Sequence, residues 1–146
     1  MISSTIRNIL RIILGLFMML AGIGHLTFQR IEFQAQVPMW LPQHPIFVDF
    51  VVLASGAIEI VFGLSLIFLK KYKPQVGMAL ALFFIIIFPG NISQYMNGID
   101  AFGLDTDQKR MTRLFFQPVL IIWVLWATNS FNYYFNKKKN NAKKHI

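Results

Sequence analysis

Glu59 lies near the middle of an apolar segment that runs from Phe47 to Leu69. The only other ionisable side chain in this segment is Asp49, close to its first residue. As a helix with a rise of ~1.5 Å per residue, the segment is roughly 35 Å long and can cross a hydrocarbon core of ~30 Å. A carboxyl group at that depth costs at least ~2.5 kcal/mol, so it needs a partner or a function. We therefore expect a membrane protein whose function depends on its polar intramembrane residues.

The composition agrees with one membrane domain. The chain has 146 residues, of which 55% are hydrophobic, and this is too apolar for an ordinary soluble domain of the same length. We expect a single domain over residues 1–146. There is no Cys in the sequence, which excludes disulfides, thiol redox chemistry and metal centres with Cys ligands.

Four apolar segments are candidates for transmembrane helices: residues 9–28, 47–69, 75–95 and 112–131. Pro89 and Pro118 lie within the last two of them. In a helical bundle, neighbouring groups can satisfy the carbonyls that a proline frees, so we expect kinked helices at these positions. The sequence therefore predicts an all-α bundle of four transmembrane helices.

The basic residues are distributed unevenly between the two sides of this bundle. Ten of the 14 fall in the N-terminal segment, the loop after the second span and the C-terminal tail of residues 136–146. These ten are Arg7, Arg11, Lys70, Lys71, Lys73, Lys137, Lys138, Lys139, Lys143 and Lys144. By the positive-inside rule we expect both termini to be cytoplasmic, in the cytoplasmic membrane of a bacterium. We expect the tail to contact the lipid bilayer and not nucleic acid, since nothing aromatic or folded accompanies its lysines.

With this topology, every span contributes a polar side chain to the outer half of the bundle. His25 falls in the outer third of the first span, and Glu59 lies near the midplane in the second. Asn91 lies near the outer end of the third span. Arg113 lies at the outer edge of the fourth, with Gln117 one turn deeper. The inner half is almost purely apolar, so the sequence predicts a polar ligand-binding pocket in the outer half.

Spacing along the first two spans places His25 and Glu59 on faces that pack against other helices. His25 follows Gly22 by three residues, and Glu59 follows Gly56 by three, so each shares a helix face with a glycine. Small residues let helix backbones approach closely in lipid. We therefore expect both side chains to point into the bundle.

Two further residues are candidates at the outer edge of the pocket. Arg113 could form an ion pair with Asp49 or with Glu59, because a long arginine side chain can extend along a helix. Trp40 lies in residues 37–42, an apolar part of the first outer loop that is bracketed by prolines. This loop is either a lid over the pocket or a segment at the membrane interface, and the sequence leaves both open.

Each polar residue also has a purely structural interpretation. Glu59 is either a buried hydrogen-bonding residue that fixes helix register or a proton relay or ligand contact. His25 is likewise either an interhelical hydrogen-bonding residue or a ligand contact. A metal site made of His25, Glu59 and Asp49 would need several coincidences, and we expect none. Haem held by paired histidines fits poorly, because His44 lies in an outer loop and His145 in the opposite tail.

Five short motifs, in order along nearly the whole chain, resemble those of DoxX-like small membrane proteins. They are Ala21-Gly22-x-x-His25, Val37-Pro38-x-Trp40-Leu41-Pro42, Ser55-Gly56-x-x-Glu59-x-x-x-Gly63-Leu64, Phe88-Pro89-Gly90-Asn91 and Arg113-x-x-x-Gln117. One departure is Gly90, where the family pattern has Ala, and we expect it to affect packing at most. The resemblance implies a four-helix membrane protein whose family-like polar set is His25, Glu59, Asn91, Arg113 and Gln117. It also suggests a link to membrane quinones, since the family takes its name from a subunit of a thiosulfate:quinone oxidoreductase.

Two functions of different classes remain open. The first is a redox-associated subunit that binds a quinone, with Glu59 exchanging protons and with His25, Arg113 and Gln117 hydrogen-bonded to the ring oxygens. Because the chain has no Cys and no flavin or haem signature, a partner subunit would have to supply the electrons. The chain would then be at most a non-catalytic or quinone-binding subunit of an oxidoreductase. The alternative is a non-enzymatic binding, assembly or transport module whose polar cluster is mainly structural. A transporter would require a homo-oligomer, since four helices are too few for one built from repeats.

Overall fold

The computed structural model describes residues 2–143 and is entirely helical over that range. The helices are α1 (Ile2–Leu26), α2 (Arg30–Gln34), α3 (Pro45–Phe68), the 3-10 helix η1 (Lys70–Tyr72), α4 (Lys73–Met96), α5 (Asp107–Ala127) and α6 (Ser130–Lys143). The expectation of an all-α fold is therefore confirmed. Pro89 and Pro118 both lie inside continuous helices.

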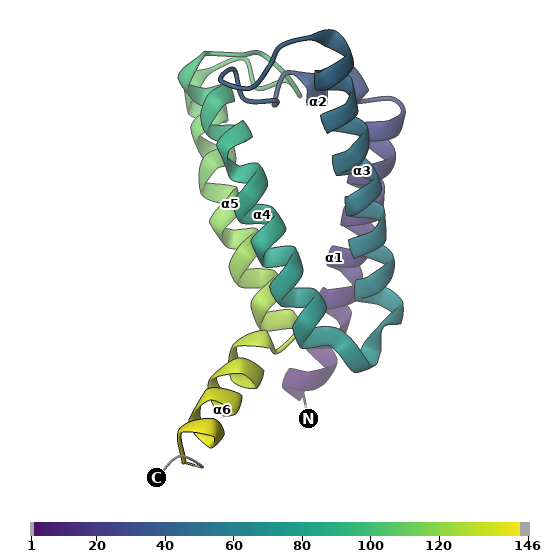
Figure 1. Ribbon diagram of the computed structural model, residues 1–146, viewed down its shortest axis with the longest axis vertical. Helices are drawn as coiled ribbons and strands as arrows, with labels where there is room; N and C mark the ends of the chain where they lie inside the picture. Colours follow the sequence, from purple (N-terminus) through teal and green to yellow (C-terminus); the bar gives the residue numbers. More distant parts are fainter. Residues whose placement is uncertain (1, 144–146) are drawn as a thin grey trace.

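The long helices form two pairs. α1 packs mainly along α3, and α4 packs mainly along α5 (Figure 1). One end of the molecule, here called the loop end, carries α2 and the connection between α4 and α5 (Figure 1). The opposite end, here called the terminal end, carries the N-terminus, η1 and α6 (Figure 1).

Three helical segments are each long and apolar enough to cross a membrane: Ser4–Leu26, Pro45–Phe68 and Lys70–Met96. α5 and α6 together make a fourth candidate, but they are bent by 62° at the break between them. The part of the chain that the structure describes thus contains three such spans, or four if the bent pair counts as one. This agrees with the membrane character that the sequence predicts.

The helix break falls inside the predicted fourth span of residues 112–131. α5 ends at Ala127, and Asn129 adopts a left-handed backbone conformation with φ of 60°. The Thr128 hydroxyl donates to the carbonyl of Val124 at 2.6 Å, and Ser130 Oγ donates to the carbonyl of Pro74 at 2.9 Å. These polar contacts end the helix at Ala127, four residues before the approximate end expected from the sequence, and attach the bend to α4. The predicted basic tail is helical as far as Lys143, and residues 144–146 lie outside the described range.

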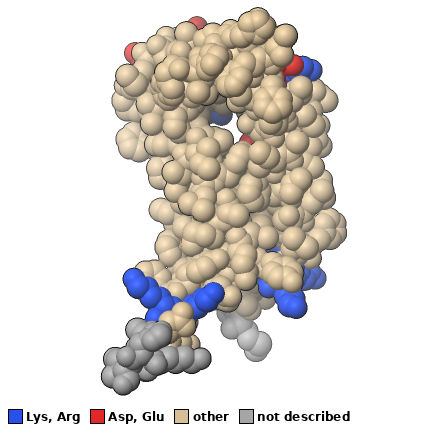
Figure 2. Space-filling view, in the orientation of Figure 1, with Lys and Arg blue, Asp and Glu red and all other residues tan. Residues whose placement is uncertain are grey.

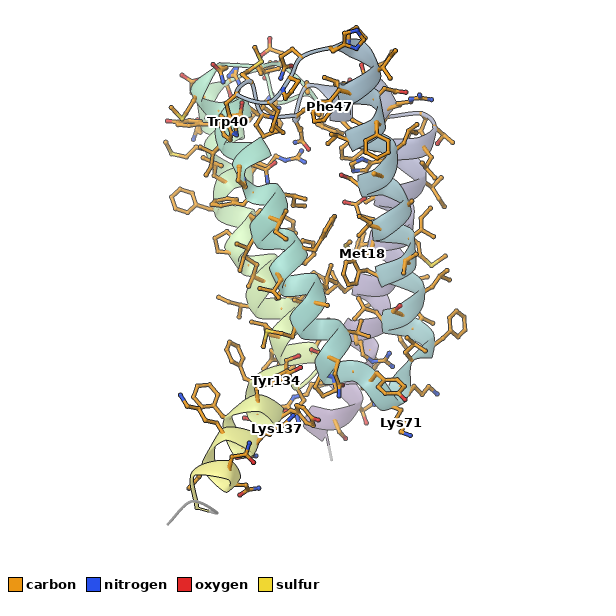
Figure 3. All side chains as sticks on the ribbon, viewed as in Figure 1. Met18, Trp40, Phe47, Lys71, Tyr134 and Lys137 are labelled. Carbon is orange, nitrogen blue, oxygen red and sulfur yellow. The ribbon has the colours of Figure 1, made fainter. Side chains whose placement is uncertain are left out.

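The apolar core occupies the terminal half of the bundle. It contains Leu14, Met18, Leu66, Leu80, Ala81, Phe83, Phe84, Val124 and Leu125, contributed by all four long helices. A smaller cluster of Val37, Val48 and Val52 lies beneath the first loop. Large apolar side chains also cover the outer faces of the helices, as Figure 3 shows, and Leu16, Phe50 and Phe115 are more than half exposed. Such a surface is expected of helices that contact lipid.

Close contact between α1 and α3 depends on glycines from both helices. A Cβ atom added to Gly22 would collide with the carbonyl oxygen of Gly56 and with the side chain of Ile60. A Cβ atom on Gly63 would meet the backbone of Gly15. These backbones therefore approach more closely than any side chain would allow, which is how small residues stabilise helix pairs in lipid.

We predict that Gly22→Ala lowers the free energy of unfolding by about 1–3 kcal/mol, because the added methyl group overpacks a backbone contact. Gly24→Ala is the matched control on the same helix. Its methyl group would meet no backbone: it would displace the flexible end of the Gln29 side chain and lie in ordinary van der Waals contact with Phe33. Alanine is also favoured over glycine in a helix by ~0.5–1 kcal/mol. The midpoint of thermal unfolding in detergent measures both variants. Equal loss of stability in the two would contradict the proposed role of the contact.

Candidate functional site

A cavity of about 450 Å³ lies between the two helix pairs, in the half of the bundle nearer the loop end (Figure 2). Most of its lining is apolar: Phe33, Val37, Pro38, Leu41, Val51, Val52, Ile58, Phe83, Ile86 and Ile87. The charged or hydrogen-bonding side chains of its lining are His25, Gln36, Ser55, Glu59, Asn91, Arg113 and Gln117. All five residues of the predicted ligand-binding set are therefore brought to one cavity.

His25 and Glu59 form one wall of the cavity. His25 Nδ1 lies 3.1 Å from the carbonyl oxygen of Val52, and His25 Nε2 lies 3.2 Å from Glu59 Oε2. The contact is possible because α3 carries Gly56 opposite the Cβ atom of His25, where any larger residue would collide. His25 is 7% exposed and Glu59 is 6% exposed. The expectation that both side chains point into the bundle is met by this geometry.

The hydrogen bond to Val52 determines how protons are arranged on the pair. A carbonyl oxygen only accepts, so Nδ1 of His25 carries a proton. A second proton then lies either on Nε2, next to an ionised Glu59, or on Glu59, which donates toward Nε2. In both cases the pair is neutral overall and holds one proton between its partners. Oε2 of Glu59 is buried, and among the residues described its polar contact is the one with His25 Nε2.

Aromatic rings connect this wall to Arg113. The ring of His25 stacks on Phe33, with centroids 3.3 Å apart, and Phe33 meets the edge of Phe102 at 4.7 Å. The guanidinium of Arg113 lies over the Phe102 ring at 4.8 Å, a cation–π contact. Phe102 has a φ of 56°, a conformation that is unfavourable for a bulky residue, and its N–H donates to the Glu32 carboxylate.

The segment that carries Phe102 is attached to α5 by a second arginine. Arg110 is 7% exposed and donates to the carbonyls of Gly98 and Ile99 at 3.1 and 3.4 Å. It also forms ion pairs with Asp100 and Asp107 at 2.7 and 3.1 Å. These contacts keep the ring of Phe102 in place between Phe33 and Arg113.

Arg113, Asn91 and Gln117 form the opposite wall as one hydrogen-bonded chain. Arg113 Nε donates to Asn91 Oδ1 at 3.1 Å, and Asn91 Nδ2 donates to Gln117 Oε1 at 3.2 Å. Gln117 Nε2 then donates to the carbonyl of Phe84 at 2.8 Å. In the described part of the chain, neither Nη atom of Arg113 donates a hydrogen bond to protein. The amides are thus satisfied by one another, whereas Arg113 keeps donors available.

Gln36, a residue of the first loop, joins this hydrogen-bond network from the loop end of the cavity. It was not among the predicted site residues. Its Nε2 donates to Asn91 Oδ1 at 3.3 Å and to Gln94 Oε1 at 3.1 Å. Gly90 allows this approach, because a Cβ atom there would collide with the carbonyl oxygen of Gln36. The departure from the family pattern at Gly90 therefore affects the packing of the loop on α4.

Asp49 lies outside the cavity, and its partner is Arg30 and not Arg113. Arg30 Nε donates to Asp49 Oδ1 at 2.6 Å, and Gln34 Nε2 lies 3.3 Å from the same oxygen. Among the residues described, Arg113 forms a direct ion pair with neither Asp49 nor Glu59, but it lies within electrostatic range of Glu59. The suggested pair with Asp49 does not form because α2 folds back beside the start of α3 and places a nearer guanidinium there. Among residues 2–143 there is no group of three His, Asp or Glu side chains suited to a metal ion.

Trp40 does not line the cavity either. It lies at the loop end, is 62% exposed and is labelled in Figure 3. Its neighbours Val37, Pro38 and Leu41 do line the cavity, and the Met39 N–H donates to Ser93 Oγ on α4 at 3.1 Å. The first loop therefore covers the cavity, but through these apolar residues and not through the tryptophan.

Phe33 and Phe102, like Gln36, belong to the site without having been predicted. Phe33 lies in a helix of five residues, and Phe102 lies in the connection before α5. Neither residue belongs to a long helix, so no helical periodicity in the sequence predicts which side chains lie next to it. Gly98 and Gly103, which flank Phe102, indicate a turn there but not the direction of its ring.

The chain belongs to the family described as a domain of unknown function, DUF8561, whose match covers residues 14–128. All five predicted ligand residues fall within that range. No curated protein and no solved structure matches the chain. The resemblance to DoxX-like proteins stays a prediction.

We predict that Asn91→Ala lowers the free energy of unfolding by about 2–3 kcal/mol, since Gln117 and Arg113 would each lose a buried partner. Asn136→Ala, at an exposed position of α6, should change it by about 0.5 kcal/mol or less, as surface substitutions do. Thermal unfolding in detergent compares the two. A similar small effect at both positions would show that the amide chain contributes little to the fold.

Proposed function

We propose that the chain is a multi-pass membrane protein with four spans and both termini in the cytoplasm. α5 would be the fourth span, and α6 would continue into the basic tail. Charge distribution supports this orientation: Lys and Arg gather at the terminal end in Figure 2, and Asp and Glu lie nearer the loop end. The positive-inside rule then places the terminal end in the cytoplasm and the cavity in the outer half, in a bacterial cytoplasmic membrane.

We further propose that the cavity binds a small amphipathic molecule with a quinone-type head group. The observation that carries this proposal is the presence of hydrogen-bonding groups on two separate walls of a mainly apolar cavity. A quinone ring has apolar faces and an oxygen at each of two opposite ends. Such a molecule matches a pocket in which a few placed polar groups fix the orientation of an otherwise apolar ligand.

The two walls would have different roles. The free Nη donors of Arg113 would bind one ring oxygen, with Asn91 holding the guanidinium in position through Nε. The His25–Glu59 pair would meet the other oxygen and would offer it the proton that the pair shares. As a redox-associated subunit the chain would position the ring and exchange this proton, and a partner subunit would supply the electrons.

The opening of the cavity favours a ligand that arrives from the bilayer. Ile58 of α3 is 43% exposed and Ile86 of α4 is 73% exposed, and both also line the cavity. The hollow seen in Figure 2, with basic and acidic atoms inside it, therefore opens between these two helices, on an apolar face. A ligand with a long apolar tail could leave the tail among the acyl chains while its head enters.

A second candidate function is a binding, assembly or transport module whose polar cluster is mainly structural. The hydrogen bonds of Asn91 and Gln117 favour it, since these two amides satisfy one another and the Phe84 carbonyl without a ligand. The buried carboxyl of Glu59, which lines the cavity beside His25, favours ligand binding instead. The two candidates therefore differ in whether the His25–Glu59 wall meets a small molecule.

Quinone binding by the purified protein tests the proposal. We predict that quinone co-purifies with the wild type, and that Glu59→Gln or Arg113→Gln weakens binding about tenfold or more, as loss of a hydrogen bond to a charged group should. Asp105→Asn is the matched control. This acid lies in an exposed loop, and it forms an ion pair with Lys109 and a hydrogen bond with its own backbone N–H. Mass spectrometry of the extracted quinone and titration with a short-chain quinone measure the effect. Unchanged affinity in a Glu59→Gln/His25→Ala double variant would eliminate this site.

A further inference from the structure

Arg11 is a buried cation at the terminal end for which the sequence supplies no acidic partner. It is 1% exposed. The six acidic residues of the chain are Glu32, Asp49, Glu59, Asp100, Asp105 and Asp107. None of them lies at the terminal end: Glu59 lines the cavity, and the other five lie in α2, near the starts of α3 and α5, or in the connection before α5. No Asp or Glu at this end can therefore balance the charge of Arg11. A buried charge without an opposite charge is strongly destabilising.

The contacts of Arg11 compensate this charge only in part. Its Nη1 donates to the carbonyl of Ile67 at 3.4 Å, in the last turn of α3, where carbonyls lack helical partners and carry partial negative charge. Its Nε is buried and has no hydrogen-bond partner among the residues described. Arg7, one turn earlier, likewise has a buried Nε without a partner there. The two guanidinium groups therefore contact neutral, dipolar oxygen atoms. Neither contacts a group that carries a full negative charge among the residues described.

Two lysines bring further positive charge to the same place. Lys73, at the start of α4, lies within electrostatic range of both Arg11 and Lys70, and its Nζ donates to Asn8 Oδ1 at 2.7 Å. Lys70 is exposed. Figure 2 shows basic side chains gathered at this end of the molecule. Three cations thus lie close together and repel one another.

We propose that Lys70, Lys73 and Arg11 form a binding site for the head-group phosphate of an anionic phospholipid. Lys70 and Lys73 contact the phosphate, and the unbalanced charge of Arg11 strengthens the site from within the bundle. A phosphate group supplies the negative charge and the acceptor oxygens that the cluster lacks. This site is separate from the cavity and does not depend on the function proposed for it.

The apolar surface beside the cluster favours a lipid over a free phosphate ion. Phe68 is 70% exposed, Leu69 is 46% exposed and Tyr72 is 49% exposed, and all three lie within two residues of Lys70 in the chain. Acyl chains can lie against these side chains while the head group reaches the lysines. A zwitterionic lipid fits less well, because the cations would repel its choline group.

Thermal unfolding of the full-length protein in bilayer discs tests this site. Discs of pure phosphatidylcholine are compared with discs that also contain phosphatidylglycerol. We expect the anionic lipid to raise the unfolding midpoint of the wild type, and Arg11→Gln and Lys73→Gln to remove most of that rise. Lys138→Gln, an equal change of charge on the exposed tail, should retain nearly all of it.

Three results would overturn the proposal. Equal loss of the rise in Lys138→Gln and in the site variants would show a general surface-charge effect. A full rise in both site variants would show that the cluster does not bind the lipid. Inorganic phosphate that raises the midpoint equally in phosphatidylcholine discs would identify an ion site and not a lipid site. If the Arg11→Gln variant does not fold, Lys73→Gln and Arg11→Lys test the site instead. The proposal then predicts that the rise in the unfolding midpoint is lost in Lys73→Gln and kept in Arg11→Lys.

Discussion

Close packing of α1 against α3 is the constraint on which the rest of the structure depends. Gly22 and Gly56 let the two backbones approach, and this approach places the imidazole of His25 between the carbonyl of Val52 and the carboxyl of Glu59. In lipid there is no hydrophobic force between helices, so van der Waals contact and polar contacts must hold them together. The same contact that pairs the helices therefore also builds one wall of the cavity.

The bundle combines a well-packed half with a hollow half. Apolar side chains of all four long helices fill the terminal half, and Met18, labelled in Figure 3, belongs to this core. In the other half the helix pairs enclose a cavity, which residues of α2 and the first loop cover. On the α4–α5 wall the amides satisfy one another, and the Nη donors of Arg113 stay available. On the α1–α3 wall the buried carboxyl of Glu59 contacts His25 and lines the cavity. Both walls therefore present polar groups to a ligand.

Much of the site could be predicted from the sequence, because depth and helical period are simple geometric quantities. A carboxyl group in the middle of an apolar segment must avoid lipid, and a glycine three residues earlier indicates the face that does so. These rules brought His25, Glu59, Asn91, Arg113 and Gln117 to one place, although their role in binding stays a prediction. The membrane character of the helices followed from their length and hydropathy.

The loops could not be predicted in the same way. Asp49 pairs with Arg30 because a helix of five residues folds back, and no periodic pattern marks such a turn. Phe102 reaches the site only through a left-handed backbone conformation that Glu32 and the neighbouring contacts of Arg110 maintain. The break at Asn129 likewise depends on tertiary hydrogen bonds from Ser130 to α4. In each case contacts between distant segments outweigh local preference.

The central claim is that two polar walls enclose a ligand cavity that opens between α3 and α4. A density map of the protein extracted together with its native membrane lipids tests this claim most directly. The account predicts density for an elongated molecule whose head lies between Arg113 and the His25–Glu59 pair and whose tail leaves beside Ile58 and Ile86. A map in which the helix pairs close on each other, or in which either wall turns toward the surrounding hydrocarbon, would contradict it.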